Sequence, residues 1–207
     1  MLLAHVLVIH GAVPHDPVTP NASPVAQARG MKLVILDRDG VINHDSPSYI
    51  KSPAEWKPIP GSLEAIALLN QAGFRVMVAT NQSGIGRGLF DMATLNAIHD
   101  KMHRALGLAG GRVDGIFYCP HAQDTGCGCR KPRPGLLEDI GRRLGVSLDG
   151  VPVIGDSLRD LQAGAAVGAQ PVLVLTGKGR LTRETGGLPP NTLIYADLAG
   201  AVQALLR

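Results

Sequence analysis

The stretch Leu33-Val34-Ile35-Leu36-Asp37-Arg38-Asp39-Gly40 decides the fold class of this chain. Its four consecutive aliphatic residues do not alternate with polar ones, which is typical of a parallel strand covered by helices on both faces. Two carboxylates then leave the strand end together, and Gly40 lets the backbone turn sharply. The stretch therefore predicts a buried parallel strand that delivers two acidic side chains to the carboxyl edge of a sheet.

From Met31 onward, short apolar runs alternate with amphipathic stretches. This order predicts an α/β fold with an open parallel (Rossmann-like) sheet and helices on both faces. We expect strands at Lys32–Leu36, Phe74–Ala79, Gly115–Tyr118, Val151–Ile154, Pro171–Leu175 and Thr192–Tyr195. We expect helices at Ser62–Gln71, Ala93–Leu106, Gly135–Leu144, Leu158–Val167 and Leu198–Leu206, with Asp91 as the N-cap of the second. The segments between the polar strand ends leave no room for a large cap domain.

The bulk composition narrows the class of protein. The chain has 207 residues, 45% of them hydrophobic but only 3% aromatic, so one aliphatic core of ordinary domain size is expected. The formal net charge of +3 suits a small anionic substrate and does not indicate a nucleic-acid-binding protein. No apolar run is long enough to predict a membrane span.

Residues 1–30 differ from the rest of the chain. Met1 to Ile9 is apolar without a preceding basic region, so a signal peptide is poorly supported, and the following segment has no clear periodicity. We interpret residues 1–30 as a disordered leader or as a misassigned start, with translation beginning at Met31. The folded domain is then residues 31–207.

Three further polar segments follow expected strands. Thr80 ends the second strand and precedes Asn81-Gln82-Ser83-Gly84, whose amides can bind phosphate oxygens. Arg130-Lys131 offers a planar fork and a compact charge for the same group. Asp156 leaves the fourth strand and can complete a site for a hard cation with the first two carboxylates. Asp160, one helical turn later, can orient Asp156 or Lys131.

The order Asp-x-Asp, Thr, Lys, Asp resembles the four motifs of the haloacid dehalogenase superfamily of phosphohydrolases. The resemblance implies that Asp37 is the nucleophile and Asp39 the general acid and base. It implies that Thr80 and Lys131 stabilise the phosphoryl group. It also implies a Mg²⁺ site formed by the Asp37 carboxylate, the Asp39 backbone carbonyl and Asp156.

All three cysteines of the chain lie in one short segment with a histidine, as Cys119-Pro120-His121 and Cys127-Gly128-Cys129. An odd number of clustered cysteines argues against a disulfide framework and for metal binding in a reducing compartment. Three thiolates and an imidazole make a closed tetrahedral Zn²⁺ site, which is structural rather than catalytic. Because Arg130 and Lys131 follow directly, we expect zinc to fix these two cations over the phosphate.

Within the superfamily, this zinc loop looks like that of the D-glycero-D-manno-heptose 1,7-bisphosphate 7-phosphatases and the related histidinol-phosphate phosphatases. The resemblance implies a small phosphorylated sugar as substrate, recognised by Arg130, by the loop residues Asn81, Gln82 and Ser83, and by a flap containing Asp45, Ser46, Ser48 and Tyr49. It also implies a monomeric cytoplasmic enzyme of nucleotide-activated heptose synthesis, commonly for lipopolysaccharide core. The alternatives are a histidinol-phosphate phosphatase, or a non-catalytic scaffold stabilised by zinc.

Two other histidine features are interpreted conservatively. His99 and His103 lie four residues apart on an expected helix, and we interpret them as exposed helix residues rather than as a metal pair. His44 lies beside the flap, where contact with substrate is the less favoured interpretation.

Overall fold

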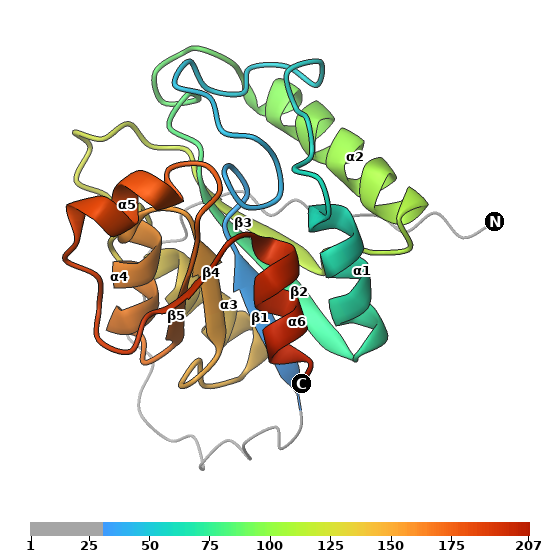
Figure 1. Ribbon diagram of the computed structural model, residues 1–207. Helices are drawn as coiled ribbons and strands as arrows, with labels where there is room; N and C mark the ends of the chain where they lie inside the picture. The colour runs from blue at the N-terminus through green and yellow to red at the C-terminus, as the bar shows by residue number, and fades with distance from the viewer. Residues whose placement is uncertain (1–30) are drawn as a thin grey trace.

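A six-stranded parallel sheet forms the centre of the structure, a computed structural model that describes residues 31–207 (Figure 1). Its strands are β1 (Lys32–Leu36), β2 (Phe74–Asn81), β3 (Gly115–Cys119), β4 (Pro152–Gly155), β5 (Gln170–Val174) and β6 (Leu193–Tyr195). The strand order is β3-β2-β1-β4-β5-β6, and all neighbouring pairs are parallel. The winding direction reverses between β1 and β4, so the ligand crevice of such a sheet is expected beyond the carboxyl ends of these two strands.

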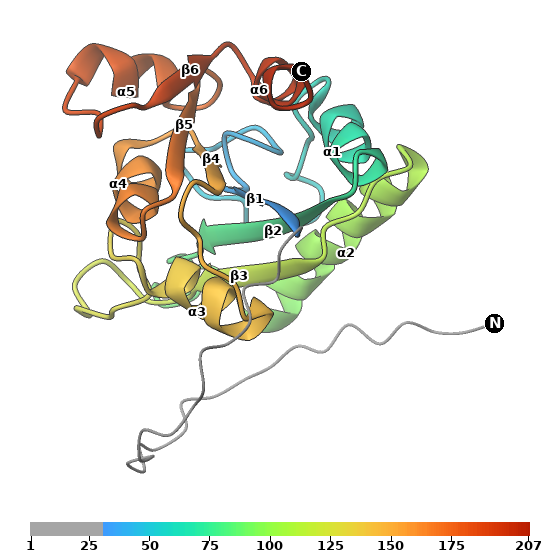
Figure 2. The same cartoon turned by 90° about the horizontal axis from the view of Figure 1, so that it is seen from below.

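Helices cover both faces of the sheet, as Figure 2 shows. Helices α1, α2 and α6 lie on one face, whereas α3 and α4 lie on the other. The bounds are α1 (Ser62–Gln71), α2 (Met92–Leu108), α3 (Gly135–Leu144), α4 (Leu158–Ala166), α5 (Gly179–Thr185) and α6 (Leu198–Leu205). The two covered faces explain why the strands are continuous apolar runs rather than alternating ones.

Each face has its own aliphatic core. Val34 and Leu36 of β1 point into the core under α1, α2 and α6, whereas Leu33 and Ile35 point into the core under α3 and α4. This alternation follows from the two-residue period of a strand. Together the two cores hold β1 rigidly, and the acidic residues that follow it therefore start from a fixed point.

The expected elements are confirmed with shifts of one or two residues at their ends, and the open parallel sheet is confirmed as well. Asp91 caps α2 by accepting a hydrogen bond from the Thr94 amide at 2.8 Å. Helix α5 was not predicted from the sequence. It is short and polar, and only Gly179 and Thr182 in it are buried, so it carries no apolar periodicity.

Residues 1–30 lie outside the described part of the chain, and the interpretation of them as a leader or misassigned start stays a prediction. Between residues 31 and 207, no helix combines the length and the hydropathy needed to span a bilayer.

Candidate active site

Asp37 and Lys131 form the centre of a buried charge cluster at the carboxyl edge of the sheet. The Asp37 amide donates to the Ile154 carbonyl at 2.9 Å, which extends the pairing of β1 with β4 by one residue and fixes the side chain above it. Lys131 Nζ lies 3.1 Å from Asp37 Oδ1, 2.7 Å from Asp160 Oδ1 and 2.6 Å from the Ala79 carbonyl. The sequence left open whether Asp160 orients Asp156 or Lys131, and the structure gives Asp160 an ion pair with Lys131.

The charges of this cluster set its protonation. Burial raises the pKa of Asp37 to about 6, although Lys131 acts in the opposite direction. Burial would lower the pKa of Lys131, but the neighbouring Asp160 and Asp37 outweigh it and raise that pKa above its usual value. Lys131 is therefore a permanent cation held against the predicted nucleophile.

Asp156 completes a group of three acids that suits a hard cation. Oxygen atoms of Asp37, Asp156 and Asp160 all lie within 4.8 Å of one another. Burial, followed by the charges of Asp160 and Asp37, raises the pKa of Asp156 to about 8. Such crowding of buried carboxylates is unfavourable without a positive charge among them, and carboxylate oxygen is the ligand that Mg²⁺ prefers. The residues present thus fit the expected Mg²⁺.

Two loops shape the surroundings of Asp156. Lys178 donates its backbone N–H to Asp156 Oδ2 at 2.8 Å, and Thr182 Oγ1 donates to the Asp156 carbonyl at 2.8 Å. A Cβ on Gly40 would lie 2.0 Å from Asp156 Oδ2, and a Cβ on Gly177 would lie 2.2 Å from it. Only glycine lets both loops approach this carboxylate so closely.

Asp39 is held by three side chains from different parts of the chain. Arg38 Nη2 lies 2.9 Å from both carboxylate oxygens, Asn43 Nδ2 donates to Oδ1 at 2.8 Å, and Gln82 Nε2 donates to Oδ2 at 3.0 Å. Burial alone would raise the pKa of Asp39, but Arg38 and these hydrogen bonds hold it below its usual range. The carboxylate is therefore ionised in the free site.

The loop after β2 supports the site by internal hydrogen bonds. Thr80, which is buried, accepts a hydrogen bond from Gln82 Nε2 at 3.0 Å. Asn81 binds the backbone of Lys131 in both directions, with its Nδ2 on the carbonyl and its Oδ1 on the N–H at 3.1 Å each. Ser83, the next residue after Gln82, is also buried. The roles of Asn81, Gln82 and Ser83 in binding substrate stay predictions. In the structure, the side chains of Asn81 and Gln82 form hydrogen bonds that hold other residues of the site in place.

The expected flap lies between β1 and α1 and reaches the loop after β5. Asp45 Oδ2 lies 2.6 Å from Lys178 Nζ, so the flap is linked to the segment that holds Asp156. Ser46 and Ser48 form a turn in which the Ser48 amide donates to Ser46 Oγ at 3.1 Å. Tyr49 has a φ of 66°, a left-handed conformation that fixes the turn. Contact of these residues with substrate stays a prediction.

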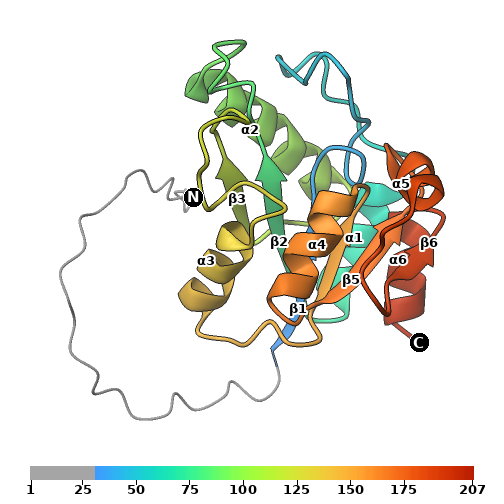
Figure 3. The same ribbon diagram turned by 90° about the vertical axis from the view of Figure 1, so that its left-hand side faces the viewer.

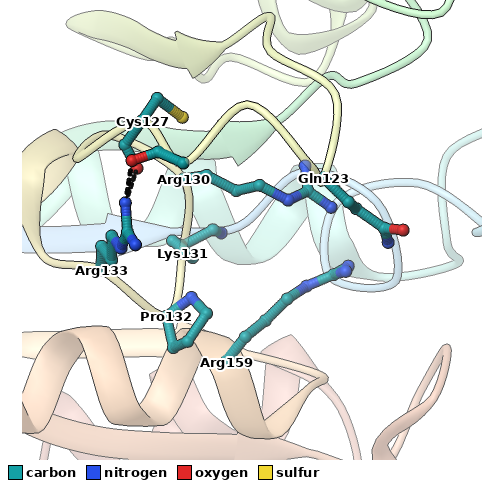
Figure 4. A pocket seen from close by; sticks show the side chains of 8 residues that line it. Gln123, Cys127, Arg130, Lys131, Pro132, Arg133 and Arg159 are labelled. Carbon is teal, nitrogen blue, oxygen red and sulfur yellow. Dashed lines mark hydrogen bonds between the residues drawn. The ribbon is translucent and has the colours of Figure 1, made fainter.

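A cationic pocket of about 340 Å³ opens beside Lys131 (Figure 4). Arg130, Lys131 and Arg159 extend their charged ends in the same direction, whereas Arg133 turns to the carbonyls of Gly126 and Cys127. Buried nitrogens of two of these residues, Arg130 Nη1 and Arg159 Nε, have no hydrogen-bond partner among the described residues. These unpartnered cationic donors suit an anionic group of the substrate.

The cysteine-rich loop brings its four expected ligands together. Cys119 Sγ lies 3.6 Å from Cys127 Sγ and 3.3 Å from Cys129 Sγ, and His121 Nδ1 lies 3.6 Å from Cys119 Sγ and 3.3 Å from Cys129 Sγ. A tetrahedral zinc site with ordinary bond lengths separates its ligand atoms by about 3.6 to 3.8 Å. The spacing therefore fits Zn²⁺, and the loop ends directly at Arg130.

The interpretation of His99 as an exposed helix residue is wrong. Its side chain is 8% exposed and contacts Arg38, because position 99 falls on the apolar stripe of α2. His103, one turn later, is partly buried, and His44 is exposed. No further ligand joins His99 and His103 in a metal-binding group among residues 31–207.

Several residues of the site were missed by sequence reasoning. Arg159, Thr176, Lys178 and Thr182 each contact a polar group of the site or line its pocket; Thr176 Oγ1, for example, donates to the Gly40 carbonyl at 2.6 Å. Arg159 had a signal, because it lies one turn after Asp156 at the start of a helix. The other three follow β5, whose end carries no recognisable motif.

Comparisons with known proteins agree with this geometry. A family model described as HAD-hydrolase-like matches residues 128–201. A D-glycero-beta-D-manno-heptose-1,7-bisphosphate 7-phosphatase from Bordetella bronchiseptica is 62% identical over 86% of this chain and 99% of its own length. One from Pseudomonas putida is 56% identical over 85% of this chain and all of its own. The chain belongs to this phosphatase family.

Solved structures of the family share the fold. The crystal structure of the D,D-heptose 1,7-bisphosphate phosphatase from B. bronchiseptica, complexed with magnesium and phosphate, has a TM-score of 0.84, with 62% identity over 85% of this chain and 98% of that one. The enzyme from Burkholderia thailandensis has a TM-score of 0.69 at 54% identity, over 84% of this chain and 98% of its own. Sequence motif, site geometry and relatives therefore indicate the same family.

Proposed function

We propose that this protein is a Mg²⁺-dependent phosphatase that removes the 7-phosphate of D-glycero-β-D-manno-heptose 1,7-bisphosphate through a phosphoaspartate at Asp37. One observation carries the proposal: Asp37 lies 3.1 Å from the buried Lys131 and within a three-carboxylate cation site, in a chain 62% identical to a relative of that name. The β anomer is taken from the names of the relatives.

The chemistry follows from the two carboxylates of the first motif. In the first step an oxygen of Asp37 bonds to phosphorus, the bond from phosphorus to the sugar oxygen breaks, and Asp39 gives that oxygen a proton. In the second step Asp39 takes a proton from water, whose oxygen bonds to phosphorus and releases Asp37. Arg38, Asn43 and Gln82 keep Asp39 ionised in the free site, which is the form that activates water. The charge of a bound phosphate favours the protonated form that the first step needs.

Asp37, Asp156 and the Asp39 backbone carbonyl would hold Mg²⁺, which supplies positive charge to the phosphoryl oxygens when bound. Lys131 and Thr80 provide a cation and a hydroxyl at the same edge of the sheet, and Asp160 fixes the lysine. Cys119, His121, Cys127 and Cys129 would hold Zn²⁺, which would keep in place the loop that directly precedes Arg130 and Lys131.

The cationic pocket supports a substrate with two phosphates. Arg130 and Arg159 line it beside Lys131, and no carboxylate is among its lining residues. A second phosphate of the sugar would compensate their charge and satisfy their unpartnered nitrogens. Substrate recognition by Arg130 and by the flap residues Asp45, Ser46, Ser48 and Tyr49 is part of this proposal.

The enzyme is proposed to act as a cytoplasmic monomer, in nucleotide-activated heptose synthesis for lipopolysaccharide core, with residues 31–207 as its catalytic domain. Family resemblance supports these assignments. Light scattering on the purified protein tests the monomer, and mass spectrometry of the native protein tests where translation starts.

The experiment that tests the proposed function is a phosphate-release assay. The purified enzyme with Mg²⁺ is given the α and β anomers of the heptose bisphosphate and, separately, histidinol phosphate. We expect the highest kcat/KM with the β anomer. Faster turnover of histidinol phosphate would assign the enzyme to the related class, and no turnover of any phosphomonoester would favour a non-catalytic scaffold.

A further inference from the structure

A buried histidine stands on the apolar stripe of α2 next to the machinery of the first motif. Leu95, Ile98, Met102 and Leu106 form that stripe, and His99 occupies the same face between them. A polar side chain at such a position is unfavourable unless it makes a hydrogen bond. The partner of His99 Nε2 is Arg38 Nη1 at 3.3 Å, 61 residues earlier in the chain.

Arg38 uses its other nitrogens on Asp39. Its Nε lies 3.1 Å from Asp39 Oδ1, and its Nη2 lies 2.9 Å from each carboxylate oxygen. The Arg38 side chain is fully buried, so water cannot replace a missing hydrogen-bond acceptor of its guanidinium group. Among residues 31–207, His99 is the hydrogen-bond partner of Arg38 Nη1, the one guanidinium nitrogen that makes no contact with Asp39. The bidentate geometry of Arg38 on Asp39 therefore depends on a contact from α2.

We propose that His99 is a positioning residue for the general acid and base, because it fixes Arg38 and thereby the Asp39 carboxylate. The inference rests on the proposed function. His99 Nε2 can accept this hydrogen bond only in the neutral form that carries its proton on Nδ1, and burial together with Arg38 lowers the pKa of His99 to about 3. The neutral form therefore prevails at neutral pH.

Asp39 has a second set of donors, which predicts a partial loss rather than an abolished activity when His99 is changed. Asn43 and Gln82 hold its two oxygens from the other side. Without His99, Arg38 can rotate away, and Asp39 keeps only these two neutral donors. Proton delivery to the leaving oxygen would then suffer, whereas Asp37, Lys131 and the carboxylates of the cation site would keep their contacts.

The test compares leaving groups that need a proton with one that does not. His99→Leu removes the acceptor with little change in shape, His99→Gln keeps an acceptor on a chain of similar reach, and His103→Leu on the same helix is the control. We measure kcat/KM for the heptose bisphosphate and for para-nitrophenyl phosphate. For each substrate, kcat/KM reports the first phosphoryl transfer and not the later hydrolysis of the phosphoaspartate. Nitrophenolate leaves without protonation, so its transfer does not need Asp39 as an acid.

We expect His99→Leu to lower kcat/KM for the sugar phosphate about tenfold, the effect of one hydrogen bond to a charged group, and to change that for para-nitrophenyl phosphate less than about twofold. His99→Gln should recover most of the loss, and His103→Leu should match the wild type on both substrates. Equal losses on both substrates, or the same loss in His103→Leu, would overturn the positioning role while leaving the proposed function intact. A wild-type enzyme inactive on both would overturn the proposed function and the inference with it.

Discussion

Lys131→Met should be one of the most destabilising single changes in the described part of the chain, although it replaces a polar side chain in a buried position with an apolar one of similar length. Lys131 is 3% exposed, and its ammonium group satisfies Asp37, Asp160 and the Ala79 carbonyl at once. The change would leave two buried carboxylates without their cation. Breaking a buried ion pair in this way costs about 3–5 kcal/mol, whereas most substitutions cost about 1 kcal/mol.

The sign of the pH dependence follows from the same contacts. Without Lys131, burial and mutual repulsion would raise the folded-state pKa of Asp37 further above its unfolded value, and Asp160 would lose the main charge that now lowers its pKa. A carboxyl group with a raised folded-state pKa is stabilising at low pH and loses that contribution as pH rises through the folded-state pKa. We therefore expect the deficit of Lys131→Met to be largest near pH 7.5 and clearly smaller near pH 5.

Urea unfolding of the zinc-loaded protein without added Mg²⁺ measures these free energies at both pH values. The matched control is Lys178→Met, which removes a lysine from the partly exposed pair with Asp45 and should cost less than about 1 kcal/mol. Adding Asp160→Asn to Lys131→Met should recover part of the loss, because one uncompensated charge is removed. Equal losses for Lys131→Met and Lys178→Met, or a deficit that does not shrink at pH 5, would refute the reasoning.

Four further predictions concern chemistry, zinc, pH and substrate selection. Asp37→Asn should lower kcat at least about a thousandfold while circular dichroism stays native, and substantial remaining phosphate release would rule out this nucleophile. Chelation of zinc, or Cys129→Ser, should lower both the Tm and the turnover with Mg²⁺ in excess; unchanged turnover in zinc-free protein would separate the loop from the site. The pKa of His99 is lowered to about 3, so its contribution to stability is complete above pH 6.5 and is lost as pH falls toward 3. In urea unfolding, the wild type should therefore lose about 1.4 kcal/mol more stability than His99→Gln between pH 7.5 and 5.5. Equal losses in the two proteins would contradict the burial of His99 as a neutral group. Arg159→Met should lower kcat/KM for the bisphosphate about tenfold and that for para-nitrophenyl phosphate less than about threefold, and an equal effect on both would remove Arg159 from recognition of the second phosphate.

The parts of the site that leave strand ends could be predicted from the sequence, because the topology of a parallel sheet brings those ends together. Asp37, Thr80 and Asp156 each follow a buried apolar run, so an open parallel sheet alone was enough to place them at one edge. The zinc site could also be predicted, because its ligands form two pairs that lie close together in the sequence. A short loop is enough to bring such pairs together. Lys131 was placed by its position directly after that loop.

The contacts that depend on rotamers and on long-range packing could not be predicted. The burial of His99 depends on which face of α2 meets the core. A polar residue on an apolar stripe cannot be predicted to be buried until its hydrogen-bond partner, here Arg38, is known. The double contact of Asn81 with the Lys131 backbone joins positions 50 residues apart. Helix α5 carries too little apolar surface for a periodic signal. Because the helix could not be predicted, the contacts of Lys178 and Thr182 could not be predicted either.

The charges of the site explain why a divalent cation belongs on the Asp156 side of the nucleophile. Lys131 forms ion pairs with Asp37 and Asp160. The Asp156 carboxylate accepts a hydrogen bond from the Lys178 backbone N–H, and this bond and the Lys178 charge lower its pKa, but burial and the neighbouring acids raise that pKa to about 8. Three buried carboxylates with one buried lysine leave an excess of negative charge, which either protons or a cation must neutralise. A dication held by Asp156 and Asp37 would supply the compensating positive charge and leave Asp37 ionised for attack, whereas protons would disable the nucleophile.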